Sequence, residues 1–159
     1  MMLRHEVDPA GAAGISGHPD FLPPQVLVVD DSTLVRGLIL RLLHRAGYRA
    51  VAVDNGASAK AFLGAAKPFL VISDLQMPGS DGWDLLAFCH DHHPEVPVLI
   101  LSGRAQGQRR EIERWAAGFL PKPFDARELR AEVDRLVSRA MSDASAPGPA
   151  GPLPPASAA

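Results

Sequence analysis

The stretch FLVISDLQMPGSDGWDLL, residues 69–86, decides the fold. It opens with a short apolar run that ends at Asp74, passes through a Pro-Gly turn, and continues as a helical pattern from about Gly82 to His92. A short, nearly continuous apolar run is typical of a strand buried on both faces of a parallel sheet. The stretch therefore predicts a strand, a turn and a crossover helix.

The same alternation of a short apolar run and a helical pattern occurs on both sides of this stretch. The sequence itself has no internal repeat. The first helix can be capped by Ser32 or Thr33 and is expected to end at Gly47. The last helix begins with the box-like pair Asp125 and Glu128. Together with the run 69–74, the short apolar runs predict strands over 26–30, 50–53, 96–102 and 118–121. Five strands, each followed by a helix, imply a doubly wound α/β fold with a parallel sheet.

Composition divides the 159 residues into one folded unit and two tails. Residues 25–141 hold the apolar periodicity, whereas residues 1–24 and 142–159 are rich in Pro, Gly and Ala and lack it. We predict one domain over 25–141, a flexible N-terminal extension before it, and a disordered Pro/Ala-rich tail after it. The residues after 141 are too few to form an effector domain.

The net charge and the cysteine content of the chain exclude several classes of protein. A formal net charge of -2 argues against a generally basic nucleic-acid binder, so we expect no direct nucleic-acid contact. The single cysteine, Cys89, excludes an internal disulfide framework and fits a reducing compartment. No apolar run is long enough to span a bilayer, and the N-terminus lacks the apolar stretch of a signal peptide. We therefore expect a cytoplasmic protein with no membrane contact.

Chemically active side chains follow four of the five predicted strands. Ligands of open α/β sheets bind beyond the carboxyl ends of the strands. Clustered carboxylates repel one another unless a cation joins them, and Mg²⁺ is the abundant hard cation that prefers oxygen ligands. A carboxylate beside Mg²⁺, a lysine and a hydroxyl suits phosphoryl transfer to an aspartate. The residues at these strand ends are Asp30, Asp31, Asp74, Ser102 and Lys122.

These motifs together resemble the receiver domain of bacterial two-component response regulators. The resemblance covers about residues 25–141 and rests on the acidic pair 30–31, the stretch around Asp74, Ser102 after VLIL, and KPF at 122–124. It implies a flavodoxin-like (βα)5 fold whose five-stranded sheet has the order 2-1-3-4-5. In that order the first and third strands are neighbours, so their acidic residues would lie side by side.

The resemblance also implies how the phosphoryl group would be held. Asp74 would be the phosphoacceptor, Lys122 would pair with the phosphoryl oxygens, and Ser102 would donate a hydrogen bond to one of them. Phe119 would be the switch aromatic, whose ring fills the space that Ser102 leaves when it moves toward the phosphoryl group. The bond between Lys122 and Pro123 is similar to one that is often cis in the family.

The same resemblance implies a set of ligands for Mg²⁺. Asp31 and Asp74 would bind the ion directly, together with the main-chain carbonyl of Gln76. Asp30 would act mainly through a metal-bound water. Gln76 also bears on catalysis, because an aspartyl phosphatase needs a second Asp two residues after its nucleophile as general acid. We therefore expect a signalling module and not an enzyme.

The function that follows is that of a phosphoacceptor in a phosphorelay. A histidine kinase or phosphotransfer protein would donate the phosphoryl group. A downstream protein, or a second copy of the chain, would then bind the surface of the fourth helix, the strand 118–121 and the last helix. Two alternatives stay open: an interaction module that works without phosphorylation, and a phosphate sink or relay intermediate.

Two features depart from the family pattern. Position 119 is Phe and not Tyr, so this ring cannot hydrogen-bond. The segment between Ser102 and Lys122 is about two residues shorter than is common, which affects the shape of the fourth helix. Apart from the site, one further cluster lies at the end of a helix without a second ligand pair, and we interpret it as structural and not metal-binding: Cys89, His90, His92 and His93.

Overall fold

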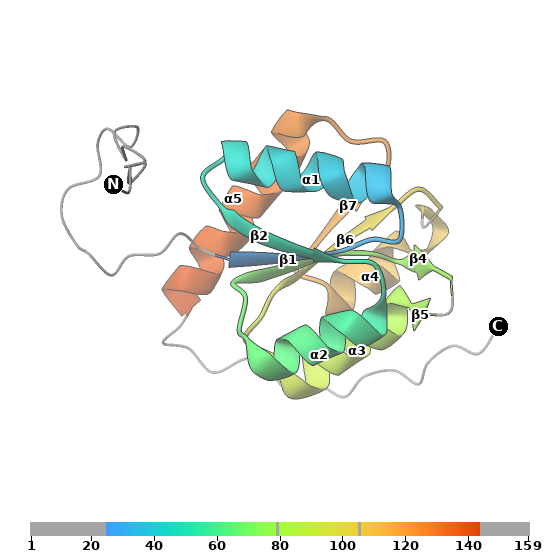
Figure 1. Cartoon of the computed structure of the whole chain (residues 1–159). Coiled ribbons are helices and arrows are strands. Elements are labelled where there is room, and N and C mark those ends of the chain that lie inside the picture. The colour runs from blue at the N-terminus through green and yellow to red at the C-terminus, as the bar shows by residue number, and fades with distance from the viewer. Residues whose placement is uncertain (1–24, 79, 105, 144–159) are drawn as a thin grey trace, which may run out of the picture.

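The computed structural model of the chain describes residues 25–78, 80–104 and 106–143, and these form a parallel sheet between two layers of helices (Figure 1). The strands of the sheet lie in the order β2-β1-β3-β6-β7, which is the predicted order 2-1-3-4-5 for the long strands in chain order. Their bounds are β1 Gln25–Val29, β2 Arg49–Val53, β3 Leu70–Asp74, β6 Val98–Ser102 and β7 Gly118–Pro121.

Helices α1 and α5 cover one face of the sheet, and α2, α3 and α4 cover the other (Figure 1). A short 3-10 turn, Gln106–Gln108, precedes α4, which is only seven residues long. No helix within the described residues combines the length and apolar character needed to cross a membrane. The bounds of the helices are α1 Thr33–Arg45, α2 Gly56–Ala65, α3 Gly82–His92, α4 Arg109–Trp115 and α5 Ala126–Ser142.

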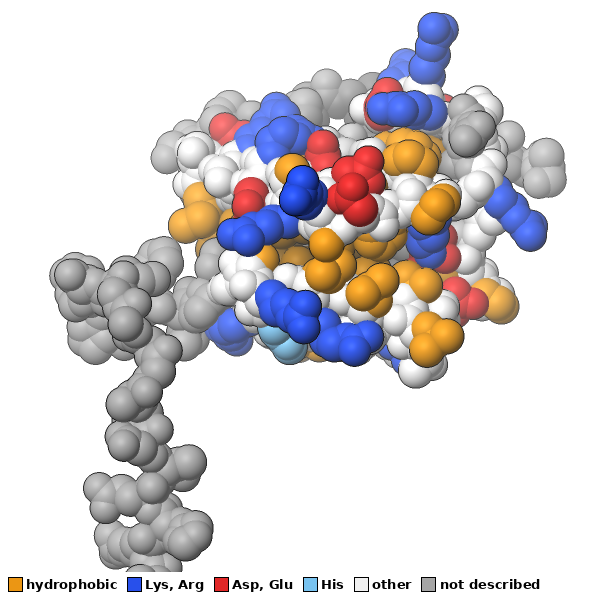
Figure 2. Space-filling view, turned by 90° about the horizontal axis from the view of Figure 1, so that it is seen from above, with side chains coloured by type: hydrophobic (Ala, Val, Ile, Leu, Met, Phe, Trp, Pro, Cys, Tyr) orange, Lys and Arg blue, Asp and Glu red, His pale blue; other side chains and the backbone are white. Residues whose placement is uncertain are grey.

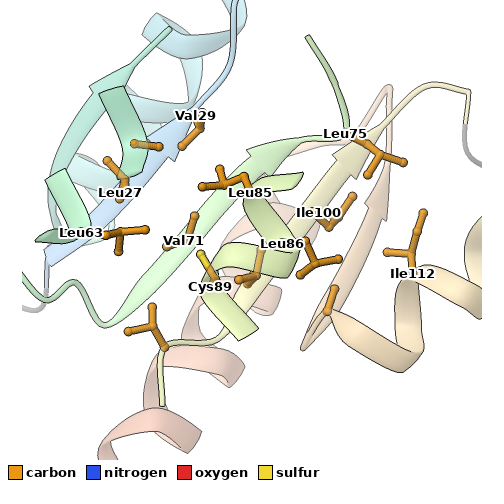
Figure 3. Close-up of a cluster of buried hydrophobic side chains, with 14 of the residues drawn as sticks. Leu27, Val29, Leu63, Val71, Leu75, Leu85, Leu86, Cys89, Ile100 and Ile112 are labelled. Carbon is orange, nitrogen blue, oxygen red and sulfur yellow. The ribbon is translucent and has the colours of Figure 1, made fainter. Parts of the chain in front are cut away.

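The core consists of two apolar clusters, one on each face of the sheet. Successive strand residues point to opposite faces, so Leu27 belongs to one cluster and Val28 to the other. Figure 3 shows the cluster beneath α2, α3 and α4, where Leu85, Leu86 and Cys89 of α3 lie against the sheet. Cys89 is almost fully buried and acts as a small apolar core residue, and this burial raises the pKa of its thiol to about 12.

The structure confirms the residues that were predicted to begin and end the first helix and to begin the last. Ser32 caps α1, because its hydroxyl oxygen accepts from the Val35 N–H at 3.4 Å. Gly47 follows the end of α1 with a φ of 90°, a conformation that favours glycine. Asp125 and Glu128 form a reciprocal capping box at the start of α5, with N–H to carboxylate distances of 2.8 and 2.9 Å.

Several predicted boundaries were wrong by one or two residues. The run 96–102 begins its strand only at Val98, since Pro97 has no N–H and instead accepts from Val71 through its carbonyl. Helix α5 continues through Ser142, whose hydroxyl donates to the Ser138 carbonyl, so Ser142 belongs to the last helix and not to the predicted tail. The remainder of the two predicted tails, residues 1–24 and 144–159, lies outside the described residues.

A small antiparallel pair of strands, which the sequence did not predict, follows directly after Asp74. It consists of β4 (Gln76–Met77) and β5 (Ser80–Asp81), and it leads into α3 at Gly82. Strands of two residues are too short to show a period-2 pattern. The pair reverses the direction of the chain, so that α3 starts against the end of β3. There the Gly82 N–H donates to the Leu75 carbonyl at 3.0 Å.

Candidate functional site

Three carboxylates meet at the carboxyl edge of β1 and β3. These strands are neighbours in the sheet, so the residues that follow β1 lie at the level of Asp74 at the end of β3. Asp30, Asp31 and Asp74 each offer a carboxylate oxygen, and these oxygens all lie within 4.8 Å of one another. In the part of the chain that the structure describes, this is the one group of three or more acidic, His or Cys residues spaced to hold a metal ion.

Asp30 is the buried member of this acidic group, with 1% of its surface exposed. Its Oδ1 accepts from the Ser32 N–H at 2.8 Å, and its Oδ2 pairs with the Lys122 ammonium at 2.9 Å. Its main-chain carbonyl accepts from the guanidinium of Arg36 at 2.7 Å. The buried charge is thus compensated, and Asp30 is held at three atoms.

Asp74 is less buried and is held at both carboxylate oxygens. Oδ1 accepts from the Gln76 N–H at 3.2 Å, and Oδ2 lies 3.3 Å from the Lys122 ammonium. Its main-chain carbonyl accepts from the Ser73 hydroxyl at 2.9 Å. These contacts orient the carboxylate at the edge of the site, and Gln76 enters the site through its main chain, with an exposed side chain.

Lys122 links the last strand to the acidic group. Burial alone would lower the pKa of Lys122, but the hydrogen bond with Asp30 and the charges of Asp30 and Asp74 raise it, so the ammonium stays charged at neutral pH. The Lys122 N–H donates to the Ser102 carbonyl at 2.9 Å, which ties β7 to β6 at the site. The bond to Pro123 is cis, as expected.

Ser102 and Phe119, the predicted switch pair, both lie buried on neighbouring strands. The Ser102 hydroxyl accepts from the Arg104 N–H at 3.3 Å. Phe119 is 8% exposed and stands opposite Ile100 in the ladder between β6 and β7. The guanidinium carbon of Arg109 lies 5.6 Å from the centroid of the Phe119 ring.

Two arginines at the site were not predicted from the sequence. Arg36 was assigned to no role, because an arginine on an amphipathic helix usually faces solvent. Its position one turn after the capping Ser32 is the signal that could have suggested contact with the strand end. Arg109 belongs to the run RREIER, residues 109–114, whose interleaved arginines and glutamates are typical of a solvated helix face. Its contact with Phe119 depends on where α4 packs, which no local pattern indicates.

From the sequence we interpreted the cluster of Cys89, His90, His92 and His93 as structural. The contacts of its side chains agree with that interpretation. Cys89 lies in the core, and His92 packs against Phe88 with ring centroids 4.7 Å apart. His90 meets Trp115 of α4 edge-on at 5.2 Å. These side chains therefore serve the packing around α3.

The acidic group fits Mg²⁺ by the chemistry of its donors. Carboxylate oxygens are the ligands that this hard ion prefers, and it commonly keeps several waters beside one or two carboxylates. Lys122 offsets part of the charge of Asp30 and Asp74, whereas Asp31 is exposed at the mouth of the site. Asp31 is therefore the carboxylate best placed to attract an ion from solution.

Replacing Asp31 with alanine should weaken Mg²⁺ binding by about tenfold or more, which corresponds to ~1.4 kcal/mol. Asp30→Ala should weaken it less, because Asp30 is already engaged by Ser32 and Lys122. Titration followed by the fluorescence of Trp83, the second residue of α3, measures this affinity. Asp91→Ala, at the far end of α3, is the control. Equal affinity in Asp31→Ala and the control would contradict a metal role for Asp31.

An acidic group paired with a lysine, beyond the central strands of an open parallel sheet, is typical of the class of doubly wound α/β domains that bind a ligand at the switch point of the sheet. The model of one family, the response regulator receiver domain, matches residues 26–134, which is more than half of the chain. The chain belongs to this family, the receiver domains of two-component response regulators.

Individual relatives support the same assignment. The DNA-binding transcriptional regulator NtrC of Escherichia coli K12 is 36% identical over 115 residues, a match that covers 71% of this chain and 24% of NtrC. The chain thus spans about a quarter of the length of that relative. The receiver domain of NtrX from Brucella abortus has a TM-score of 0.67 at 33% identity, covering 71% of this chain and 98% of that one. The chemotaxis response regulator CheY4 of Vibrio cholerae has a TM-score of 0.67 at 27% identity, covering 72% and 99%.

Proposed function

We propose that this receiver domain accepts a phosphoryl group on Asp74 from a histidine kinase or phosphotransfer protein. The observation that carries the proposal is the ammonium of Lys122, which lies 2.9 Å from Asp30 and 3.3 Å from Asp74. A cation held between two carboxylates at the mouth of a site is placed to stabilise the negative oxygens of an incoming phosphoryl group. The domain acts as a signalling module and not as an enzyme.

The proposed transfer is a single displacement at phosphorus. A carboxylate oxygen of Asp74 forms a bond to phosphorus while the bond from phosphorus to the donor's imidazole nitrogen breaks, and that nitrogen keeps the electron pair. Lys122 pairs with one phosphoryl oxygen, and the Ser102 hydroxyl donates to another. Bound Mg²⁺ would supply further positive charge at these oxygens. Asp31, Asp74 and the Gln76 carbonyl would hold it directly, with Asp30 acting through a water.

The surface beside the site suits a protein donor. Helix α1 starts directly after the acidic pair, and its first turn carries Leu34, which is 86% exposed. Leu38, one turn further, is also exposed. Figure 2 looks onto the α1 and α5 side and shows hydrophobic side chains gathered among Lys and Arg on this face. A kinase or phosphotransfer protein that reaches Asp74 would cover this exposed apolar surface.

We propose that α4, β7 and α5 form the surface that changes on phosphorylation and binds the downstream partner. Ser102 ends β6, and Phe119 lies on β7 next to it, so a movement of this pair acts first on β7 and the helices beside it. A downstream protein, or a second copy of the chain, would bind this surface with different affinity in the two states. Only such a difference in affinity lets a partner respond to the state of the domain.

Phosphorylation by a small donor tests the proposed function. With acetyl phosphate and Mg²⁺ the protein should gain the mass of one phosphoryl group, and it should gain none when the metal is chelated. Intact-mass spectrometry measures both. A protein that gains no phosphoryl group with Mg²⁺ present would instead be an interaction module that works without phosphorylation.

A further inference from the structure

The side chain of Arg109 covers a ring that is otherwise part of the core. Its guanidinium carbon lies 5.6 Å from the centroid of the Phe119 ring, within the range of a cation–π contact. The ring belongs to a residue that is 8% exposed, whereas the Arg109 side chain is 57% exposed. An exposed cation at the first residue of α4 therefore lies between the ring and the solvent.

The guanidinium of Arg109 is held in this position by its own helix. Its Nε donates to the Glu113 carboxylate at 2.8 Å, one turn further along α4. The middle and the end of α4 are attached to the domain: Ile112, the central residue, is fully buried, and Trp115, the last residue, makes an edge contact with His90.

The near end of α4 has fewer attachments. Within the described residues, Gln108 occupies the N-cap position without a side-chain capping hydrogen bond. A helix of seven residues gains little from its own hydrogen bonds, so tertiary contacts decide where its first turn lies. The contact between Arg109 and the Phe119 ring therefore attaches the first residue of α4, ahead of the buried Ile112.

We propose that Arg109 is a positioning residue that holds the Phe119 ring in its buried place and couples that ring to α4. A tyrosine at position 119 would have a hydroxyl for polar contacts, but Phe119 offers only the negative face of its ring. The guanidinium binds that face. When the ring leaves its buried place the contact breaks, and the first residue of α4 loses this attachment.

The regulatory part of this inference rests on the proposed function. The receiver resemblance associates a buried ring with the state in which Ser102 has moved toward the phosphoryl group. A contact that favours the buried ring then favours the phosphorylated state. Because coupling is reciprocal, phosphorylation of Asp74 strengthens the attachment of α4 to the ring.

The first experiment measures the resting protein and needs no phosphorylation. Arg109→Gln removes the charge, Arg109→Lys keeps it, and Arg110→Gln is the control on the exposed neighbouring residue. The ring of Phe119, labelled with ¹³C, is followed by NMR with a soluble paramagnetic agent that broadens exposed groups. Arg109→Gln should raise the exposed ring population about two- to fivefold, the effect expected for a cation–π contact near the surface, and Arg109→Lys should restore part of the loss.

The second experiment measures coupling through the ring. Phe119→Leu keeps an apolar side chain but has no ring face. In the wild-type background, Arg109→Gln should lower the phosphorylated fraction reached with acetyl phosphate by about two- to fivefold. In the Phe119→Leu background it should change nothing, because a residue that acts through the ring has no effect when the ring is absent.

The outcomes separate this inference from the proposed function. If Arg109→Gln matches Arg110→Gln in ring exposure, the inference is wrong, whatever happens to phosphorylation. The proposed coupling of Arg109 to phosphorylation through the Phe119 ring is also wrong if Arg109→Gln lowers phosphorylation equally with Phe and with Leu at position 119. If the wild-type protein is not phosphorylated but Arg109→Gln exposes the ring, the proposed function fails and the positioning role stands.

Discussion

Asparagine in place of Asp74 should abolish phosphorylation and leave the domain folded. The amide oxygen can still accept the hydrogen bond from the Gln76 N–H, and Lys122 keeps its closer carboxylate partner, Asp30. Asparagine lacks the anionic oxygen that attacks phosphorus, so the variant has no nucleophile. Incubation with acetyl phosphate and Mg²⁺ should give no mass gain, with the melting temperature close to that of the wild-type protein.

The matched control for this variant is Asp54→Asn. Asp54 follows β2 at the same edge of the sheet, is exposed, and accepts a hydrogen bond from the adjacent Asn55 side chain. This control should be phosphorylated as fast as the wild-type protein. If Asp74→Asn still gains one phosphoryl group at the wild-type rate, the phosphoacceptor is another residue.

Alanine in place of Gly82 should cause the largest loss of stability of any single change that we consider. A Cβ at this position would lie 2.5 Å from the Leu75 Cα and 2.6 Å from the main-chain carbonyl oxygens of Asp74 and Leu75. These are backbone atoms at the end of β3, so they can yield only if the strand end moves. We expect a loss of about 3 kcal/mol, the upper range for overpacking a core, which is roughly 10 °C in melting temperature.

The same change at Gly64 is the control for this effect. Gly64 lies in α2, and beyond the backbone of its own helix no heavy atom lies within 4 Å of where a Cβ would stand, so Gly64→Ala should be neutral or stabilise the helix by about 0.5–1 kcal/mol. Thermal unfolding of both variants measures the contrast. Equal melting temperatures would mean that α3 does not start against the end of β3 as the structure describes.

Much of the fold and of the acidic group could be predicted from the sequence, because both depend on local patterns. Apolar runs predicted the strands, and parallel strands necessarily bring their carboxyl ends to one edge. The sequence therefore predicted that Asp30, Asp31, Asp74 and Lys122 lie at the same edge of the sheet. The resemblance to receiver domains supplied the strand order, which the residues alone did not determine.

Other features could not be predicted, because they depend on tertiary packing. The need for glycine at position 82 arises only when α3 meets the end of β3. The contact from Arg36 to the Asp30 carbonyl and that from Arg109 to the Phe119 ring depend on side-chain orientations that the helical period does not specify. The short pair β4 and β5 falls below the length at which a strand has a recognisable pattern.

The pairing of Asp30 with Lys122 has a consequence for how the protein is made. The two residues are 92 positions apart, so a growing chain exposes its acidic pair well before the lysine has been synthesised. Contacts of such long sequence separation form late, since the intervening chain must first be ordered. A nascent or truncated chain that lacks β7 therefore holds its carboxylates without their cation. Lys122 can therefore compensate the charge of Asp30 only once the chain has been extended beyond β7.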